Sequence, residues 1–172
     1  MILTLDNSAF TYLVNPNAKP PNDPSTGTPV AHAKERIEGL ISSLGKQSRL
    51  ILPTPALAEA LVGAGLGAVE LIEKLNQQSK ILVVPFDQKC AVELAMMHME
   101  VIEKSGSKRG GSTEPWQKVK FDRQIVAIAK VHNSTRIFSD DIGLCSFAKT
   151  VGLEAVSTWE LPVPEKDLDL FG

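Results

Sequence analysis

TRIFSDDIGL, residues 135–144, is an apolar run typical of a buried strand, and it ends in a serine and two adjacent aspartates. One interpretation is a simple turn, because aspartate favours turns and helix N-caps. Asp140 would then cap a helix over IGLCSFAKTVG, residues 142–152. The alternative is that carboxylates gather at the end of this strand for a chemical purpose. Which interpretation holds depends on whether other acidic residues lie at equivalent places in the chain.

Working outward from this stretch, short apolar runs alternate with segments of helical periodicity. Strands are expected at residues 2–5, 49–53, 80–86, 135–139 and 153–157. Helices are expected at residues 8–14, 31–44, 55–65, 67–76, 88–104, 116–132 and 142–152. Thr54 and Asp87 are positioned as N-caps of the helices that follow them. Strands separated by helices predict an α/β fold with a parallel sheet that is covered on both faces.

Length and composition limit the architecture and the class of protein. A chain of 172 residues, 43% of them apolar, predicts one domain over residues 1–160 and a C-terminal tail at 161–172. A proline-rich loop is expected at 15–29 and a basic loop at 104–116. The N-terminus does not resemble a signal peptide and no run approaches 18 apolar residues, so we expect a cytoplasmic protein without a membrane segment. The formal net charge of −2 means that any contact with nucleic acid requires a local basic patch.

Acidic residues occur on four separate elements. Asp6 follows the first expected strand, and Asp140 and Asp141 follow the fourth. Open parallel sheets bind ligands at the carboxyl ends of their strands, where the strand order reverses. Glu59 has small apolar neighbours at helical spacing, and Asp122 lies beside the apolar stripe of its own helix. The sequence therefore predicts that acids from four elements meet at one edge of the sheet.

LTLDNSAF, PTPALAEAL, KFDRQIVAIAKVHN and RIFSDDIGL together resemble, in that order, the signature of the PIN-domain family. The resemblance covers nearly the whole chain apart from the proline-rich loop and the tail. It implies a three-layer α/β/α sandwich with a parallel five-stranded sheet of order 3-2-1-4-5, in which strands one and four are neighbours. The family pattern of a hydroxyl residue, any residue and an acid matches Ser139 and Asp141. Asp140 directly follows the strand and could instead be the inward acid.

The resemblance also implies an acidic site for Mg²⁺ or Mn²⁺. Clustered carboxylates repel one another, and a hard divalent cation that prefers oxygen ligands relieves this repulsion. Asp6 and Asp122 are the expected direct ligands, and Glu59 and Asp141 are expected to ligate directly or through water. Asp140 is retained as a further metal ligand, and Ser8 is expected to orient a water. The predicted catalytic residues are thus Asp6, Ser8, Glu59, Asp122 and Asp141.

By the same resemblance, the expected function is a metal-dependent endoribonuclease, of the kind found in VapC-type toxins of toxin–antitoxin modules. The implied partners are an RNA substrate and an antitoxin-like protein, and a homodimer is left open. Trp116 could stack on an unpaired base or simply pack. The residues expected to contact RNA are Lys108, Arg109, Lys118, Lys120 and Arg123.

Two rival functions use the same pattern. A catalytically idle PIN-like module that binds RNA or protein is the first, and the presence of all four acids argues against it. An aspartyl-phosphate phosphotransferase is the second. It would need another acid close to Asp6, and Asn7 and Ser8 supply none.

Overall fold

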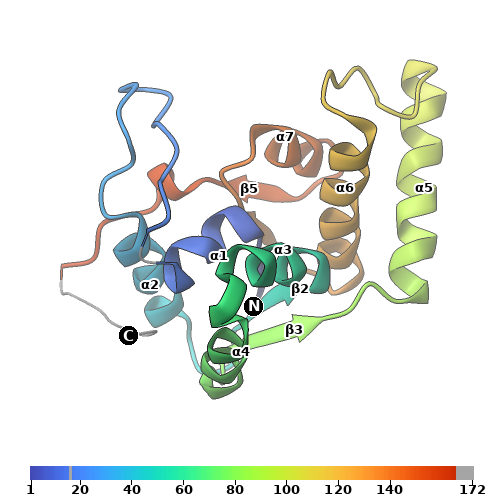
Figure 1. Ribbon diagram of the computed structural model, residues 1–172. Coiled ribbons are helices and arrows are strands. Elements are labelled where there is room, and N and C mark those ends of the chain that lie inside the picture. The colour runs from blue at the N-terminus through green and yellow to red at the C-terminus, as the bar shows by residue number, and fades with distance from the viewer. Residues whose placement is uncertain (16, 166–172) are drawn as a thin grey trace.

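The computed structural model describes residues 1–15 and 17–165 and contains one five-stranded parallel sheet (Figure 1). Its order is β3-β2-β1-β4-β5, as the resemblance implied. The strands are β1 (Ile2–Leu5), β2 (Arg49–Pro53), β3 (Ile81–Val84), β4 (Arg136–Phe138) and β5 (Glu154–Val156).

Helices cover both faces of the sheet and make a three-layer α/β/α sandwich. Right-handed crossovers place the helices between β1, β2 and β3 on one face and the helices between β3, β4 and β5 on the other. The first group is α1 (Asn7–Val14), α2 (Ala33–Ser43), α3 (Thr54–Ala64), the short 3-10 helix η1 (Gly65–Gly67) and α4 (Ala68–Gln77). The second group is α5 (Gln88–Ser105), α6 (Trp116–Val131) and α7 (Ile142–Thr150). A second 3-10 helix, η2 (Thr158–Glu160), follows β5.

The strands at the centre of the sheet are almost completely buried. Leu5, Leu50 and Ile137 have no exposed surface, as expected for a sheet covered on both faces. The register pairs Leu5 of β1 with Phe138 of β4, so the residues that follow these two strands are neighbours. The backbone changes direction here, because β1 leads toward β2 and β4 leads toward β5. This crevice is where a parallel sheet of this type binds its ligands.

Two expected helix caps are wrong, although the helices themselves form. Asp141, not Asp140, caps α7 by accepting a hydrogen bond from Leu144 N at 2.8 Å. The Thr54 hydroxyl accepts from Phe86 N at 3.3 Å and does not cap α3. Asp87 does cap α5, because its carboxylate accepts from Cys90 N at 3.0 Å. In both failures another element competes for the side chain of the expected cap.

Two long connections lie at the ends of this framework. One joins α1 to α2 and contains the proline-rich loop, and the other joins α5 to α6 and contains most of the basic loop (Figure 1). Residue 16 of the first loop lies outside the described residues. So do residues 166–172 of the expected C-terminal tail.

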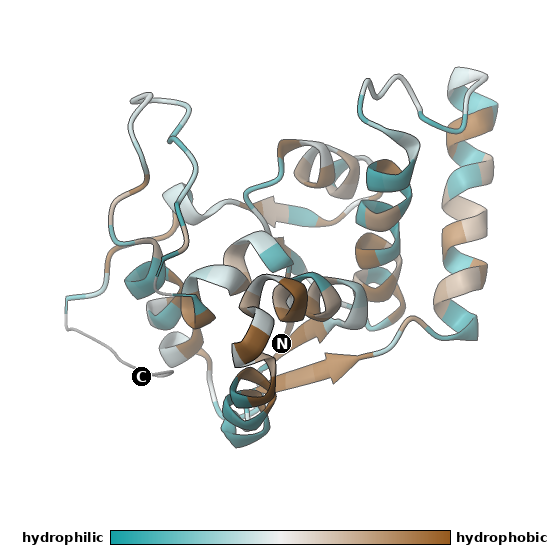
Figure 2. Ribbon diagram, viewed as in Figure 1, coloured by the Kyte–Doolittle hydropathy of each residue, from teal (hydrophilic) through white to brown (hydrophobic). Residues whose placement is uncertain are grey.

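The stretch Thr54–Gln77 is long and apolar enough to cross a membrane by length and composition. In this structure it comprises α3, η1 and α4, and Leu57, Ala60, Leu71 and Leu75 from it are buried in the domain core. Other apolar side chains of the stretch face outward, including Val62 and Leu66. In Figure 2 the brown of α3 marks its apolar residues, whereas α4 alternates brown with teal. The apolar residues of Thr54–Gln77 are therefore divided between the domain core and an exposed surface.

Candidate functional site

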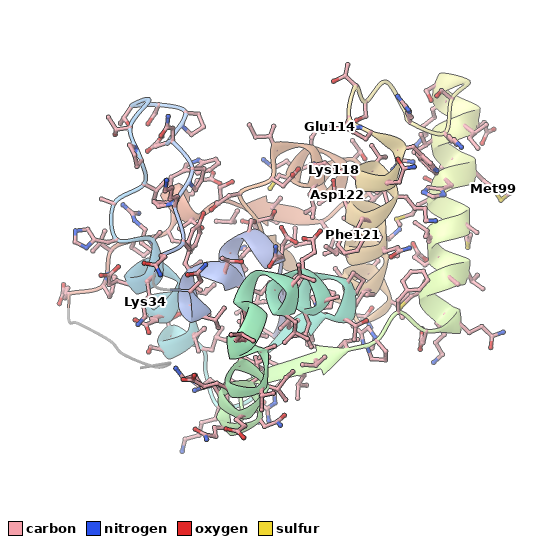
Figure 3. All side chains as sticks on the ribbon, in the orientation of Figure 1. Lys34, Met99, Glu114, Lys118, Phe121 and Asp122 are labelled. Carbon is pink, nitrogen blue, oxygen red and sulfur yellow. The ribbon has the colours of Figure 1, made fainter. Side chains whose placement is uncertain are left out.

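A pocket of about 470 Å³ lies at the crevice between the ends of β1 and β4. Four acids from four separate elements line it: Asp6, Glu59, Asp122 and Asp141. Figure 3 shows Lys118, Phe121 and Asp122 on α6, and Lys118 and Phe121 also line the pocket. The remaining lining residues are Asn7, Ser8, Gln117 and Ile125.

Two serines hold Asp6 at the base of the pocket. Ser8 Oγ donates to Asp6 Oδ2 at 2.9 Å, and Ser139 Oγ donates to the same oxygen at 2.7 Å. Each hydroxyl also accepts from a backbone N–H that follows β4, Asp140 N on Ser8 and Asp141 N on Ser139. Burial raises the pKa of Asp6, while the two hydroxyls and the backbone N–H groups of α1 lower it. The serines therefore fix the carboxylate and join the ends of β1 and β4.

Lys118 links Asp122 and Asp141, the two half-buried acids of the pocket. Its Nζ lies 2.6 Å from Asp141 Oδ2 and 3.2 Å from Asp122 Oδ2. Burial and the charge of Asp141 raise the pKa of Asp122 to about 6, against the opposing effect of Lys118. Burial acts in the same direction on Asp141, but Lys118 and the N–H of Leu144 outweigh it and hold the pKa of Asp141 below its usual range. Asp141 lies closer to Lys118 than Asp122 does and also caps a helix. Of the two acids it is therefore the one more strongly held in its ionised form.

Glu59 reaches the pocket from α3 and lies at its open side. Its side chain is exposed, and Asn7 Nδ2 donates to Glu59 Oε2 at 3.1 Å. Asn7 is itself fixed, because its Oδ1 accepts from Thr11 on the next turn of α1 at 3.0 Å. Partial desolvation and the nearby charge of Asp6 raise the pKa of Glu59. Its small apolar neighbours in the sequence are unusual for a solvated glutamate, and the structure nevertheless places Glu59, exposed, at the mouth of the pocket.

The donor set of the pocket fits a hard divalent cation. Carboxylate and hydroxyl oxygens are the ligands that Mg²⁺ and Mn²⁺ prefer, and Asp122 and Asp141 already present their oxygens to one cationic group, the ammonium of Lys118. Within the described part of the chain, however, no three His, Cys, Asp or Glu side chains are arranged as a ready metal site. Two of the pocket acids point to Lys118 instead of a common centre.

Comparison with solved structures places this arrangement in a known fold. VapBC-1 from nontypeable Haemophilus influenzae superposes with a TM-score of 0.59 at 17% identity, over 92% of this chain and 98% of that one. FitAB bound to a DNA fragment superposes with a TM-score of 0.57 at 22% identity, over 94% of this chain and 98% of that one. VapC20 from Mycobacterium tuberculosis is described as a toxin that cleaves the sarcin-ricin loop. It superposes with a TM-score of 0.50 at 15% identity, over 88% of this chain and 95% of that one. The fold of this chain is PIN-like. No protein-family model and no curated protein sequence matches the chain.

The PIN-like fold brings together the five residues predicted as catalytic, since Asp6, Ser8, Glu59, Asp122 and Asp141 line one pocket. It does not bring Asp140 among them. Asp140 Oδ2 accepts from the Tyr12 hydroxyl at 2.8 Å and Oδ1 accepts from Thr158 N at 2.6 Å. Both oxygens are thus used to tie α1 and η2 to the end of β4. This geometry gives no support to Asp140 as a metal ligand.

The basic residues of the PIN-like chain are distributed differently from the expected RNA-binding rim. Arg123 is only 3% exposed and donates to Lys108 O at 2.5 Å and Arg109 O at 3.0 Å, which fastens the loop before α6. This burial contradicts the expectation that Arg123 contacts phosphate. Lys118 lies inside the acidic pocket. Lys108 Nζ lies 4.5 Å from the centre of the Trp116 ring, and Arg109 and Lys120 are exposed.

Asn7 and Ser139 are the site residues that the sequence prediction left out of its catalytic set. Ser139 was visible as the hydroxyl of the hydroxyl-x-acid pattern, and its bond to Asp6 gives that pattern a structural reason. Asn7 carried no signal beyond its place after Asp6, because its contact with Glu59 depends on how α1 packs beside α3. The ion pair of Lys118 with Asp141 likewise depends on the approach of α7 to α6.

Proposed function

We propose that this chain is a metal-dependent endoribonuclease that hydrolyses RNA phosphodiester bonds at the acidic pocket. The observation that supports this most is the convergence of four acids, from four separate elements, at the strand-order reversal of a PIN-like fold. VapC20, which shares the fold, is described as a toxin that cleaves the sarcin-ricin loop.

Asp6, Asp122 and Asp141 would hold the Mg²⁺ or Mn²⁺, and Glu59 would complete the set at the open side. The bound ion would lower the pKa of a coordinated water and stabilise charge on the attacked phosphodiester. Ser8 and Ser139 keep Asp6 oriented through their two hydrogen bonds to its Oδ2. Asn7 holds Glu59 near the pocket, in a position to accept a proton from a water at the mouth.

The RNA would approach along exposed basic residues of the loop before α6 and of α6 itself, which are Lys108, Arg109 and Lys120. Phosphate contacts of this kind supply most of the sequence-independent affinity for nucleic acid. We keep Arg123 out of this set because it is buried. The exposed face of Trp116 is covered in part by Lys108, so stacking on a base would require Lys108 to move.

We also propose a protein partner and a cytoplasmic location for the chain. Among the structures with this fold, FitAB was solved bound to a DNA fragment, and VapBC2 from Rickettsia felis was solved bound to a DNA fragment from its promoter. Exposed apolar side chains on α5, namely Val92, Met96, Met99 and Ile102, would give a partner or a second copy a surface to bury. Met99 points outward from α5, away from the rest of the domain (Figure 3).

A cleavage assay tests the activity directly. Purified protein should cut structured RNA when Mn²⁺ or Mg²⁺ is added and should stop when a chelator removes the ion. Asp6→Asn should reduce cleavage by orders of magnitude while the protein remains folded by circular dichroism. RNA binding without cleavage under all metal conditions would instead favour the binding-module function.

A further inference from the structure

A lysine forms part of the acidic pocket itself. Lys118 contacts both Asp122 and Asp141, and all three residues line the pocket. Lys118 lies one turn before Asp122 on α6, so the two side chains share a helix face. Its side chain is 37% exposed, whereas those of Asp122 and Asp141 are 16% and 27% exposed.

The surroundings leave room for this contact and fix its acceptor. A Cβ at position 143 would lie 3.1 Å from Asp141 Oδ1 and 3.8 Å from Lys118 Nζ, so Gly143 keeps this corner uncrowded. Asp141 is held from the other side by Leu144 N. The carboxylate that Lys118 binds most closely is therefore fixed in place.

We propose that Lys118 is a tethered counter-ion that competes with the divalent metal for Asp122 and Asp141. This inference rests on the metal site of the proposed function. The Lys118 ammonium and a divalent cation need the same carboxylate oxygens, and two positive charges bound to the same carboxylates repel each other. A metal that binds both acids therefore requires Lys118 to leave them.

The apparent affinity for the metal then depends on the fraction of molecules in which Lys118 is paired with Asp122 and Asp141. If about one molecule in ten has Lys118 away from the acids, the apparent affinity is about tenfold weaker than that of the same acids without the lysine. Lys118 would keep the pocket charge-balanced at low metal concentration. It would also raise the concentration of metal at which the nuclease becomes active.

Calorimetric titration with Mn²⁺ at physiological salt tests the competition. The proteins compared are wild type, Lys118→Met, Lys118→Arg and Lys120→Met. Lys118→Met should bind Mn²⁺ about tenfold more tightly than wild type. Lys118→Arg should remain close to wild type, because a guanidinium still pairs with carboxylates. Lys120→Met removes the same charge from an exposed position on α6 and should change little, because exposed charges are screened over about 8 Å at this salt.

A thermal melt of the same proteins supplies a readout that does not depend on activity. In chelator, Lys118→Met should melt at a lower temperature than Lys120→Met, because two acids lose their counter-ion. Saturating Mn²⁺ should remove that difference. Lys118→Gln is a second neutral variant if Lys118→Met does not fold.

The outcomes separate this inference from the proposed function. Mn²⁺ affinity in Lys118→Met that is equal to or weaker than in Lys120→Met overturns the counter-ion role, and so does a lack of Mn²⁺ binding by all the proteins. Tighter Mn²⁺ binding by Lys118→Met supports the role even if none of the proteins cleaves RNA. In that last case only the nuclease function fails.

Discussion

Asp140 and Asp141 are adjacent in the chain, and their carboxylates enter different networks. Asp140 accepts from Tyr12 and Thr158, which lie on separate elements, whereas Asp141 lines the pocket and pairs with Lys118. Asp141→Asn should therefore abolish most RNA cleavage, and it should still cap α7 because asparagine is a good N-cap. Asp140→Asn should retain cleavage and cost about 1 kcal/mol of folding stability, since it weakens bonds to a charged acceptor. Cleavage rates and urea melts of the two variants check this, and the opposite pattern would assign the site to Asp140.

Asp122 gives a prediction for stability as a function of pH. Its pKa is raised to about 6 in the folded chain, above the ordinary value of 3.8. A carboxyl with a raised folded pKa contributes stability that is complete below pH 3.8 and is lost as the pH rises through about 6. Asp122→Asn should remove that loss. In chelator at pH 7.5, the variant should be more stable than wild type by on the order of 2 kcal/mol. A variant that melts at or below the wild-type temperature at this pH would contradict a strained carboxylate at position 122.

At the scale of elements, the packing of α5 against α6 contains a histidine whose charge state matters. His98 packs against Trp116 with ring centres 5.4 Å apart and the ring planes tilted by 49°, and its buried Nε2 has no hydrogen-bond partner among the described residues. Burial, together with the charges of Arg123, Lys108 and Lys120, lowers the pKa of His98. Protonation would therefore place positive charge on a ring whose Nε2 meets neither water nor an acceptor.

His98→Phe tests this element directly. A histidine with a lowered folded pKa contributes stability that is present above its unfolded pKa of about 6.5 and is lost as the pH falls through the folded value. Wild type should therefore lose more melting temperature than His98→Phe between about pH 6.5 and pH 5. Melts in chelator at several pH values would show it, and parallel curves for the two proteins would mean that His98 does not titrate on unfolding.

The sequence was sufficient to predict most elements, because their signals are local. β1 and β2 have the bounds expected from an apolar run that a polar residue or a proline stops. The sequence could not decide which of two adjacent aspartates caps α7, because both fit the cap and Tyr12 on a distant helix takes one of them. Arg123 was misplaced for a similar reason. The loop before α6 folds back and presents its carbonyls to the guanidinium, and helical periodicity does not describe a loop's path.

At the scale of the whole molecule, the distribution of basic residues determines whether RNA, a polyanion, can bind near an acidic pocket. The chain carries 18 basic and 20 acidic residues, so no general attraction draws RNA to it. Lys118 is held within the pocket and Arg123 within the core. The positive charge left for RNA on α6 and the loop before it is then that of Lys108, Arg109 and Lys120.

Changing Lys108, Arg109 and Lys120 to glutamine should therefore weaken RNA binding and flatten its dependence on salt. Each lost phosphate contact removes up to about 0.7 from the slope of log affinity against log salt for a single strand. The affinity for Mn²⁺ should stay at the wild-type value, because none of the three lies among the pocket acids. A triple variant with Lys46, Lys89 and Lys149 changed to glutamine removes the same charge from exposed positions on other segments. If both triple variants lose RNA affinity equally, the effect is one of net charge, and Lys108, Arg109 and Lys120 make no specific contact with RNA. If only the first loses it, the RNA path runs from the loop before α6 to the acids at the ends of β1 and β4.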